Sequence, residues 1–256
     1  MLRVIDIGKT NTVLGIYDGD HLVQHWRLAT SHSRTSDEYG VLIRQLFEMA
    51  PHEIQKIDGC IVACVVPPML ATITGMVERF FNIVPLVVGP GIKTGMPILY
   101  ENPREVGADR VVNAVAAFER YRQACIVVDF GTATTFDAIA ADGRYLGGSI
   151  VPGVVISAEA LFQRASKLPR VEIAAPEKVI GRNTVSSMQS GLLYGYVSLV
   201  DGMVERISEE MQCSVRVIAT GGLSSLFATH SRRIEDYDPD LTLVGLKILF
   251  ERNART

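Results

Sequence analysis

The fold is decided by the stretch Val4-Ile5-Asp6-Ile7-Gly8-Lys9-Thr10-Asn11-Thr12-Val13-Leu14-Gly15. An apolar strand ends near a carboxylate, a tight turn of small polar residues follows, and a second apolar strand begins. Glycine allows close backbone approach, and the hydroxyls, amide and N–H groups of the turn can hold a phosphate and the water of its metal ion. The same residue types are common in ordinary hairpin turns. This stretch alone therefore leaves a phosphate-binding turn and a plain hairpin both open.

The same pattern returns in the second half of the chain. Ile5 to Thr12 aligns without a gap to Val128-Asp129-Phe130-Gly131-Thr132-Ala133-Thr134-Thr135. Each copy continues into a strand and then an Asp-Gly hairpin signal, at Asp18-Gly19 and at Asp142-Gly143. Strand, Asp-x-Gly, hydroxyl-rich turn, strand and hairpin recur in one order, which a single accidental turn would not produce. The sequence therefore predicts a duplicated fold with one phosphate turn in each half.

Hydrophobic periodicity predicts the elements between these motifs. In the first half we expect strands at 2–7, 13–17, 22–28, 57–66 and 84–88, and helices at 35–50, 69–81 and 108–121. In the second half we expect strands at 125–129, 136–140, 145–150 and 215–219, and helices at 154–166, 184–211, 224–230 and 239–253. This order predicts an α/β protein with two similar halves, residues 1–121 and 122–256, that face each other across a nucleotide cleft.

Composition excludes several classes of function. The net charge of −3 and the lack of a basic run argue against nucleic-acid binding. No segment approaches the 18 consecutive apolar residues, roughly, that indicate a membrane span. Asp6 and Lys9 come too early for a signal peptide, so we expect a cytoplasmic location. All four cysteines are interpreted as small core residues. Cys60 and Cys64 would lie about 13 Å apart on one strand, too far for a disulfide.

A second region of interest runs from Tyr100 to Asn113, where an acid and a base begin an apolar helix. Asp109 is either a carboxylate favoured by the helix dipole or a catalytic base. As a base it would be weak, but in phosphoryl transfer its position matters more than its basicity. Arg110 offers a guanidinium fork for a carboxylate or phosphate, or else a surface salt bridge.

The two Asp-x-Gly turns and the later Gly221-Gly222 turn resemble the phosphate-1, phosphate-2 and adenosine elements of the actin-like ATPases, sugar kinases and Hsp70-like proteins, whose halves are ribonuclease-H-like. Within that superfamily, the ordered set of motifs resembles the type III pantothenate kinases. The motifs are Asp6-x-Gly8, Gly107-Ala108-Asp109-Arg110, Asp129 to Thr135, Gly147-Gly148-x-x-x-Pro152-Gly153, Gly181-Arg182-Asn183-Thr184 and Gly221-Gly222. The resemblance implies phosphorylation of pantothenate by ATP, the first step towards coenzyme A.

The resemblance also implies a set of site residues. Asp109 would be the base that faces the pantothenate hydroxyl, and Asp129 would hold a monovalent cation, K⁺ or NH₄⁺. The pantothenate pocket would be lined by Tyr100, Gly107, Ala108, Asp109, Arg110 and Thr184, with a neighbouring subunit of a homodimer helping to complete it. ATP with Mg²⁺ would be bound by Asp6, Ile7, Gly8, Lys9, Thr10, Asn11, Thr12, Val13 and Thr132.

Structural alternatives remain open for several of these residues. Thr184 begins a helix and could serve as its N-cap. Thr132 and Thr135 could satisfy only the backbone of their turn. Three glycines of the long predicted helix would permit close packing, for example at a dimer seam; these are Gly191, Gly195 and Gly202.

One position departs from the family pattern. Type III pantothenate kinases usually have asparagine after the first Asp-x-Gly, and here Lys9 replaces that amide with a flexible cation. Lys9 could pair with a phosphate, pair with Asp6, or replace part of the charge of the monovalent cation. The alternatives to a pantothenate kinase are a kinase of another small hydroxy acid or sugar, and a nucleotide-binding regulatory relative whose catalysis Lys9 impairs.

Overall fold

The computed structural model describes residues 1–50 and 57–254, which form two compact units. Unit 1 contains Met1–Gly95, Asn102–Ala116 and Thr242–Thr256, and unit 2 contains Met96–Glu101 and Ala117–Leu241. The C-terminal helix thus belongs almost entirely to unit 1. The division of the chain at residue 121 stays a prediction of its domain boundary.

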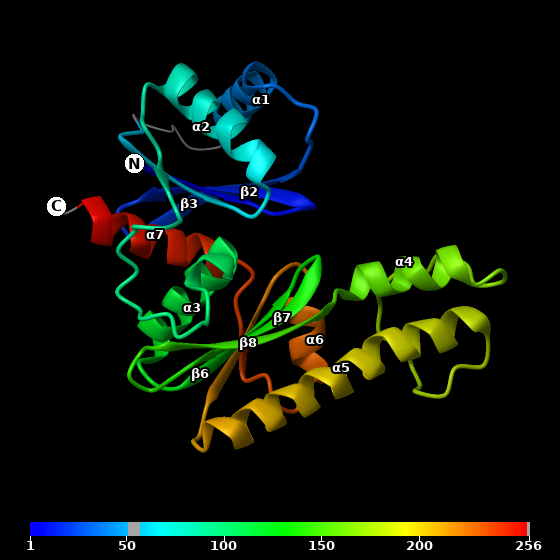
Figure 1. The fold of residues 1–256 in the computed structure, drawn as a ribbon. Coiled ribbons are helices and arrows are strands. Elements are labelled where there is room, and N and C mark those ends of the chain that lie inside the picture. Colours follow the sequence, from blue (N-terminus) through cyan, green and yellow to red (C-terminus); the bar gives the residue numbers. More distant parts are fainter. Residues whose placement is uncertain (51–56, 255–256) are drawn as a thin grey trace. The chain divides into compact units, whose positions relative to one another are not determined.

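Unit 1 is built on a mixed five-stranded sheet with the order β3-β2-β1-β4-β5 (Figure 1). The central strand β1 pairs antiparallel with β2 and parallel with β4. Strands buried on both faces are often continuously apolar, as β4 is, whereas β1 also contains Arg3 and Asp6. The bounds are β1 Leu2–Ile7, β2 Asn11–Asp18, β3 His21–Ala29, β4 Gly59–Cys64 and β5 Leu86–Val87.

Helices cover both faces of this sheet. The helices α1 (Ser36–Glu48) and α2 (Pro67–Phe81) enclose a core on the face that Ile5 and Ile7 occupy. Thr35 caps α1 and forms a capping box with Glu38. The prediction that α2 begins at Met69 was wrong by two residues, because proline is well suited to the first turn of a helix.

The other face of the unit 1 sheet is contacted by α7 (Leu241–Ala254), and α3 (Ala108–Tyr121) packs on α7. Glycines make the close contacts possible. A Cβ added to Gly15 would lie 3.1 Å from the Leu243 side chain, and one added to Gly59 would lie 2.4 Å from the Phe250 ring. α7 contacts α3 where Gly245 meets the backbone of Val112. The 3₁₀ turn η1 (Pro103–Glu105), which the sequence did not predict, precedes α3.

Unit 2 repeats the sheet with the order β10-β9-β6-β7-β8. Strand β6 pairs antiparallel with β7 and parallel with β9, as β1 does with β2 and β4. The duplication predicted from the sequence is confirmed strand by strand. The bounds are β6 Cys125–Phe130, β7 Ala133–Ile139, β8 Tyr145–Pro152, β9 Arg216–Thr220 and β10 Asp236–Tyr237, the last of which was not predicted.

The helices of unit 2 pack on the sheet face that contains Val128 and Phe136. The 28-residue α5 and the short α6 form most of this core, and α4 extends beside α5 away from the sheet (Figure 1). The predicted bounds of α5 and α6 are confirmed. The three helices are α4 Val154–Arg164, α5 Thr184–Met211 and α6 Ser224–His230.

The gapless alignment of the two motifs is wrong by one residue after the glycine. In unit 1, Ile7 pairs with Thr12 across a turn of Gly8 to Asn11. In unit 2, Phe130 pairs with Thr134 across the shorter turn Gly131 to Ala133. Thr12 therefore corresponds to Thr134 and not to Thr135, because register follows the hydrogen-bonded ladder.

The cysteine prediction is confirmed in part. All four thiols are free, and burial raises the pKa of both Cys60 and Cys125 to about 12. Cys213 is exposed just after α5, so its interpretation as a core residue was wrong. No helix among residues 1–50 and 57–254 is both long and apolar enough to cross a membrane.

Candidate active site

The first phosphate turn connects β1 to β2 in unit 1. The Gly8 N–H donates to the Asn11 carbonyl at 2.9 Å, and a Cβ on Gly8 would lie 2.9 Å from the same oxygen. Asp6 lies on β1 opposite Val13 of β2 and Ala63 of β4. Glycine is thus needed for the closure of the turn, and the Asp6 carboxylate has apolar cross-strand neighbours.

Thr30 also contacts this turn, although no sequence motif indicated it. Its hydroxyl donates to the Gly8 carbonyl at 2.8 Å, and its N–H donates to the Thr10 carbonyl at 2.9 Å. The hydroxyls of Thr30 and Thr12 are 2.9 Å apart. Only the hairpin pairing of β2 with β3 brings residues 12 and 30 together, so no local motif could have identified Thr30.

Lys9 and Thr10 are exposed at the tip of the turn, whereas Ile7 and Thr12 are buried. Ile7 therefore can contribute to a bound phosphate only through its backbone. The ammonium of Lys9 forms no ion pair or hydrogen bond with any residue in the described ranges. An ion pair between Lys9 and Asp6 is thus not part of this structure.

The N-terminal turn of α3, also in unit 1, holds the predicted base. Burial raises the pKa of the Asp109 carboxyl, against the lowering effects of the Arg110 N–H, 2.8 Å from Oδ1, and of the Arg110 charge. Asp109 is thus more basic than an exposed aspartate. It is therefore a stronger base than the sequence alone led us to expect. Arg110 is only 7% exposed, so its interpretation as a surface salt-bridge residue was wrong.

We expect Gly107→Ala to lower kcat by about tenfold or more with a smaller effect on folding. A Cβ at position 107 would lie 2.5 Å from Asp109 Oδ1, so the carboxylate would have to rotate, and displacement of the predicted base would lower the rate. The measurement is steady-state kinetics beside thermal unfolding. An unchanged kcat would show that the Asp109 orientation does not limit turnover.

The second phosphate turn, in unit 2, is enclosed by two other glycines. Its own Gly131 N–H donates to the Ala133 carbonyl at 3.1 Å. A Cβ on Gly153 would lie 2.2 Å from the Thr132 carbonyl oxygen. A Cβ on Gly221, which has φ +89°, would lie 2.6 Å from Asp129 Oδ1. Asp129, Thr132 and the predicted adenosine turn are therefore brought together.

Asp129 has polar neighbours on both adjacent strands, unlike Asp6. Its cross-strand partners are Thr135 on β7 and Thr220 on β9, so the three side chains share one face of the sheet. Thr220 is buried, and its hydroxyl has no hydrogen-bond partner among the described residues. The Thr135 hydroxyl donates to Asp137 at 3.2 Å, so its lone pairs remain available. One carboxylate and two hydroxyls are the oxygen donors that a hard monovalent cation prefers.

Tyr100 packs beside β8 of the same unit. Its ring lies 3.7 Å from the Cβ position of Gly147, which has φ +123°. Two backbone hydrogen bonds fix the segment that precedes Tyr100. The Tyr145 N–H donates to the Pro97 carbonyl, and the Leu99 N–H donates to the Tyr145 carbonyl. The Tyr145 hydroxyl donates to the buried carboxylate of Asp137 at 2.6 Å. Tyr100 is thus held on the edge of a rigid sheet.

Thr184 begins α5, and its interpretation as an N-cap was wrong. The cap is Asn183, whose side chain accepts from the Ser186 N–H at 2.8 Å. Thr184 is exposed, and its hydroxyl is not needed by the helix. Figure 1 shows this end of α5 beside the far end of α4, well away from the sheet of unit 2. The structure of one chain does not bring Thr184 to Asp129 or Thr132.

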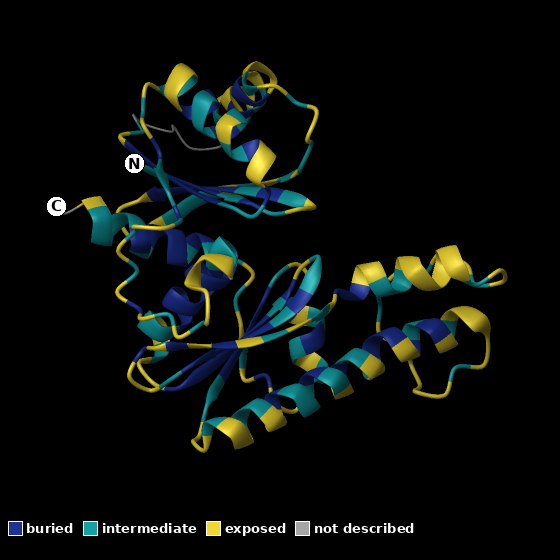
Figure 2. Cartoon of the chain, viewed as in Figure 1, coloured by how far each residue is buried: buried dark blue, intermediate teal, exposed yellow. Residues whose placement is uncertain are grey.

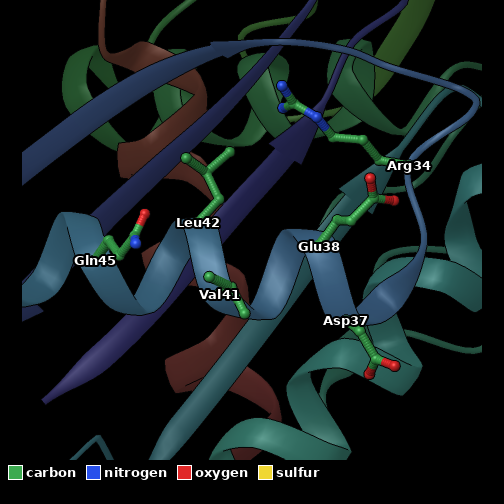
Figure 3. A pocket seen from close by; sticks show the side chains of 6 residues that line it. All are labelled: Arg34, Asp37, Glu38, Val41, Leu42 and Gln45. Atoms are coloured by element: carbon green, nitrogen blue, oxygen red, sulfur yellow. The ribbon is translucent and has the colours of Figure 1, made fainter.

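An open hollow of about 420 Å³ lies along α1, and none of the predicted site residues line it (Figure 3). Its walls come from Arg34, Asp37, Glu38, Val41, Leu42 and Gln45. No group of three or more His, Cys, Asp or Glu side chains suited to a metal ion occurs in the part of the chain that the structure describes.

Two sheets of one topology, each with an Asp-x-Gly turn after its central strand, define the class of actin-like ATPases and sugar kinases. An inorganic polyphosphate/ATP-glucomannokinase from Arthrobacter sp. strain KM shares this fold, with a TM-score of 0.54 and 16% identity over 98% of this chain and 99% of its own. The sequence also matches the family described as type III pantothenate kinase over residues 2–206. The chain belongs to that family.

Full-length relatives agree with this assignment. The chain is 60% identical over 253 residues to the type III pantothenate kinase of Anaeromyxobacter sp. (strain Fw109-5), covering 99% of this chain and 100% of the relative. It is 58% identical to the type III pantothenate kinase of Myxococcus xanthus (strain DK1622), covering 99% of each.

Proposed function

We propose that this protein phosphorylates pantothenate with ATP, as the first step of coenzyme A biosynthesis. Family membership over the full chain supports the substrates. The observation that carries the chemistry is Asp109, a carboxylate made more basic by burial at the start of α3. A base of this kind can take the proton of an acceptor hydroxyl.

Each predicted residue has a role in this proposal. Asp109 orients the pantothenate hydroxyl and accepts its proton as the oxygen attacks the γ-phosphorus of ATP, while the bond from that phosphorus to the ADP oxygen breaks and ADP leaves. Arg110 stabilises the negative charge of the bound acceptor. Gly107 leaves room for the Asp109 carboxylate. Tyr100, Ala108 and Thr184 line the acceptor pocket. The turn from Asp6 to Val13 and the backbone around Thr132 hold the phosphates.

Two ions fit the residues present. Mg²⁺ bound with ATP neutralises charge on the phosphates, and Asp6 would hold it through water, because Val13 and Ala63 beside it offer no side-chain ligand. K⁺ or NH₄⁺ would be held at Asp129, with the hydroxyls of Thr135 and Thr220 as further oxygen donors.

Lys9 would act on the phosphates in this scheme. Its exposed ammonium has no partner among the described residues, so the proposal needs no ion pair to be broken before ATP binds. A lysine in a phosphate turn behaves as a flexible point charge. We propose that it adds to ATP binding and leaves catalysis intact.

A coupled assay of ADP release with pantothenate, Mg²⁺ and K⁺ tests the proposed function. We expect turnover that depends on pantothenate and exceeds turnover with a panel of other hydroxy acids and sugars. A much better acceptor in that panel would replace pantothenate as the substrate. Binding of MgATP without turnover, restored by Lys9→Asn, would instead indicate a regulatory protein.

We also propose a homodimer that completes the acceptor pocket. Exposed apolar side chains gather on the arm formed by α4 and the start of α5, where Figure 2 shows mostly exposed surface along α4. A Cβ on Gly191, Gly195 or Gly202 would meet nothing within 4 Å, so these glycines leave room for another chain. The exposed apolar residues are Val155, Ile156, Leu161, Phe162, Val179, Ile180 and Val185.

We expect Ile180→Asp to weaken dimerisation at least tenfold and to raise the KM for pantothenate, because it places a charge in an apolar interface. The matched control is Val84→Asp in unit 1, since both side chains are 83% exposed. Sedimentation equilibrium measures the dimer. An unchanged dissociation constant of the dimer in the Ile180 variant would exclude this arm as the interface.

A further inference from the structure

We infer that Thr30 is a positioning residue for ATP binding, which sets the shape of the first phosphate turn from the neighbouring strand. This inference rests on the proposed function, because it assigns the turn to phosphate binding. Thr30 lies one residue beyond the end of β3 and contacts the turn at three points, Gly8, Thr10 and Thr12.

These contacts fix the backbone of the first phosphate turn and the direction in which its carbonyl groups point. The Thr30 hydroxyl holds the Gly8 carbonyl, and the Thr30 N–H holds the Thr10 carbonyl two residues later. With both carbonyls turned towards Thr30, the intervening peptide of Lys9 is restricted. A preorganised turn binds its ligand better because it loses less conformational freedom on binding.

The hydrogen bonds also assign the proton of Thr12. A hydroxyl has one proton, and the proton of Thr30 goes to the Gly8 carbonyl, which can only accept. In the 2.9 Å contact between the two hydroxyls, Thr12 is therefore the donor. The side chain of Thr12 thus has no proton left for a phosphate oxygen. Its contribution to ATP binding is to hold Thr30.

The second half of the protein provides an internal comparison. Because Thr12 corresponds to Thr134, the register places Gly153 at the position of Thr30. Gly153 has no hydroxyl, and the buried hydroxyl of Thr134 indeed lacks a hydrogen-bond partner among the described residues. The hydroxyl bridge is specific to the first turn.

Thr30 is itself held in place from the core of unit 1. The next residue, Ser31, donates its N–H to the Tyr39 hydroxyl at 3.1 Å, and that hydroxyl lies 3.2 Å from the Ser31 carbonyl. Tyr39 is fully buried on α1. The hydrogen bonds of Thr30 and Ser31 therefore connect the phosphate turn to a packed helix rather than to a free loop, as a positioning role requires.

Calorimetric titration of the full chain with MgATP, in the absence of pantothenate, tests the inference. We expect Thr30→Val to raise the Kd about tenfold, through loss of two hydrogen bonds, and Thr30→Ser to remain within about twofold of the unmodified chain. The KM for pantothenate should change less than the Kd for MgATP. Thr74→Val on α2, which also removes a hydroxyl bonded to a backbone carbonyl, is the matched control.

Several outcomes would overturn the inference. An unchanged Kd in Thr30→Val would do so, as would a serine variant as weak as the valine variant. If Thr30→Val fails to fold, Thr30→Ala carries the same expectation. If the unmodified chain does not bind MgATP, the proposed function fails together with this inference. Equal binding by the unmodified chain and Thr30→Val defeats the inference alone.

Discussion

Asp109→Asn is expected to lower pantothenate-dependent kcat by about 10²–10⁴-fold and to stabilise the folded protein at neutral pH. The rate falls because an amide cannot accept the proton of the acceptor hydroxyl. The shape of the side chain is kept, and the amide oxygen can still accept the Arg110 N–H, which is 2.8 Å from Oδ1. Substrate binding should therefore change less than kcat.

The gain in stability follows from the direction of the pKa shift. Burial raises the pKa of Asp109 in the folded state, so the charged carboxylate is disfavoured there relative to the unfolded chain. The stability contributed by this group is fully present below the unfolded pKa of about 3.9 and is lost as the pH rises through the folded pKa. The asparagine variant avoids that loss, so its advantage should disappear in acid.

Kinetics and chemical denaturation at several pH values check both parts of this prediction. The matched control is Asp142→Asn, because Asp142 is exposed in a hairpin turn and pairs only with nearby Arg144 among the described residues. The control should leave kcat unchanged. Full turnover in Asp109→Asn would remove Asp109 from the mechanism, whatever its effect on stability.

Gly153→Ala is expected to destabilise unit 2 by about 3 kcal/mol and to weaken MgATP binding at least tenfold. The new Cβ would lie 2.2 Å from the Thr132 carbonyl oxygen and 2.7 Å from that of Gly131. Both contacts are with backbone, so relief requires the second phosphate turn to move, and overpacking of this kind costs about 1–3 kcal/mol. A displaced turn presents its groups wrongly to the ligand.

Gly89→Ala provides the control for this substitution. Gly89 also lies in a loop, and a Cβ there would meet nothing within 4 Å, so we expect no loss of stability. Denaturant unfolding and MgATP titration measure the two effects. If Gly153→Ala binds MgATP as well as the unmodified chain does, the close packing at Gly153 is not needed to shape the turn.

Local and repeated patterns made much of the fold predictable. The bounds of β1, α3, α5 and α6 were predicted to the residue because an apolar period stops at a clear signal in each case. The duplication was predicted because Asp6 and Asp129 lie in the same order of motifs. Two short elements, β10 and η1, were missed, whereas the equally short β5 lies within an apolar run that predicted a strand at 84–88.

The parts of the site that depend on pairing between strands could not be predicted. The polar neighbours of Asp129 lie on two other strands, and Thr220 is 91 positions away from it along the chain. Thr30 joins the first turn only through the β2–β3 register. The stronger basicity of Asp109 depends on burial, which no local motif specifies.

The two phosphate turns are held by different residues at equivalent positions, Thr30 in unit 1 and Gly153 in unit 2. These two residues therefore could not be swapped between the halves. A threonine at position 153 would run into two carbonyl oxygens, and a glycine at position 30 would leave Thr12 without its acceptor. Duplication produced two copies of one sheet, yet the residues at this shared position are no longer interchangeable. The two halves still share one strand topology, but the side chains at this position differ.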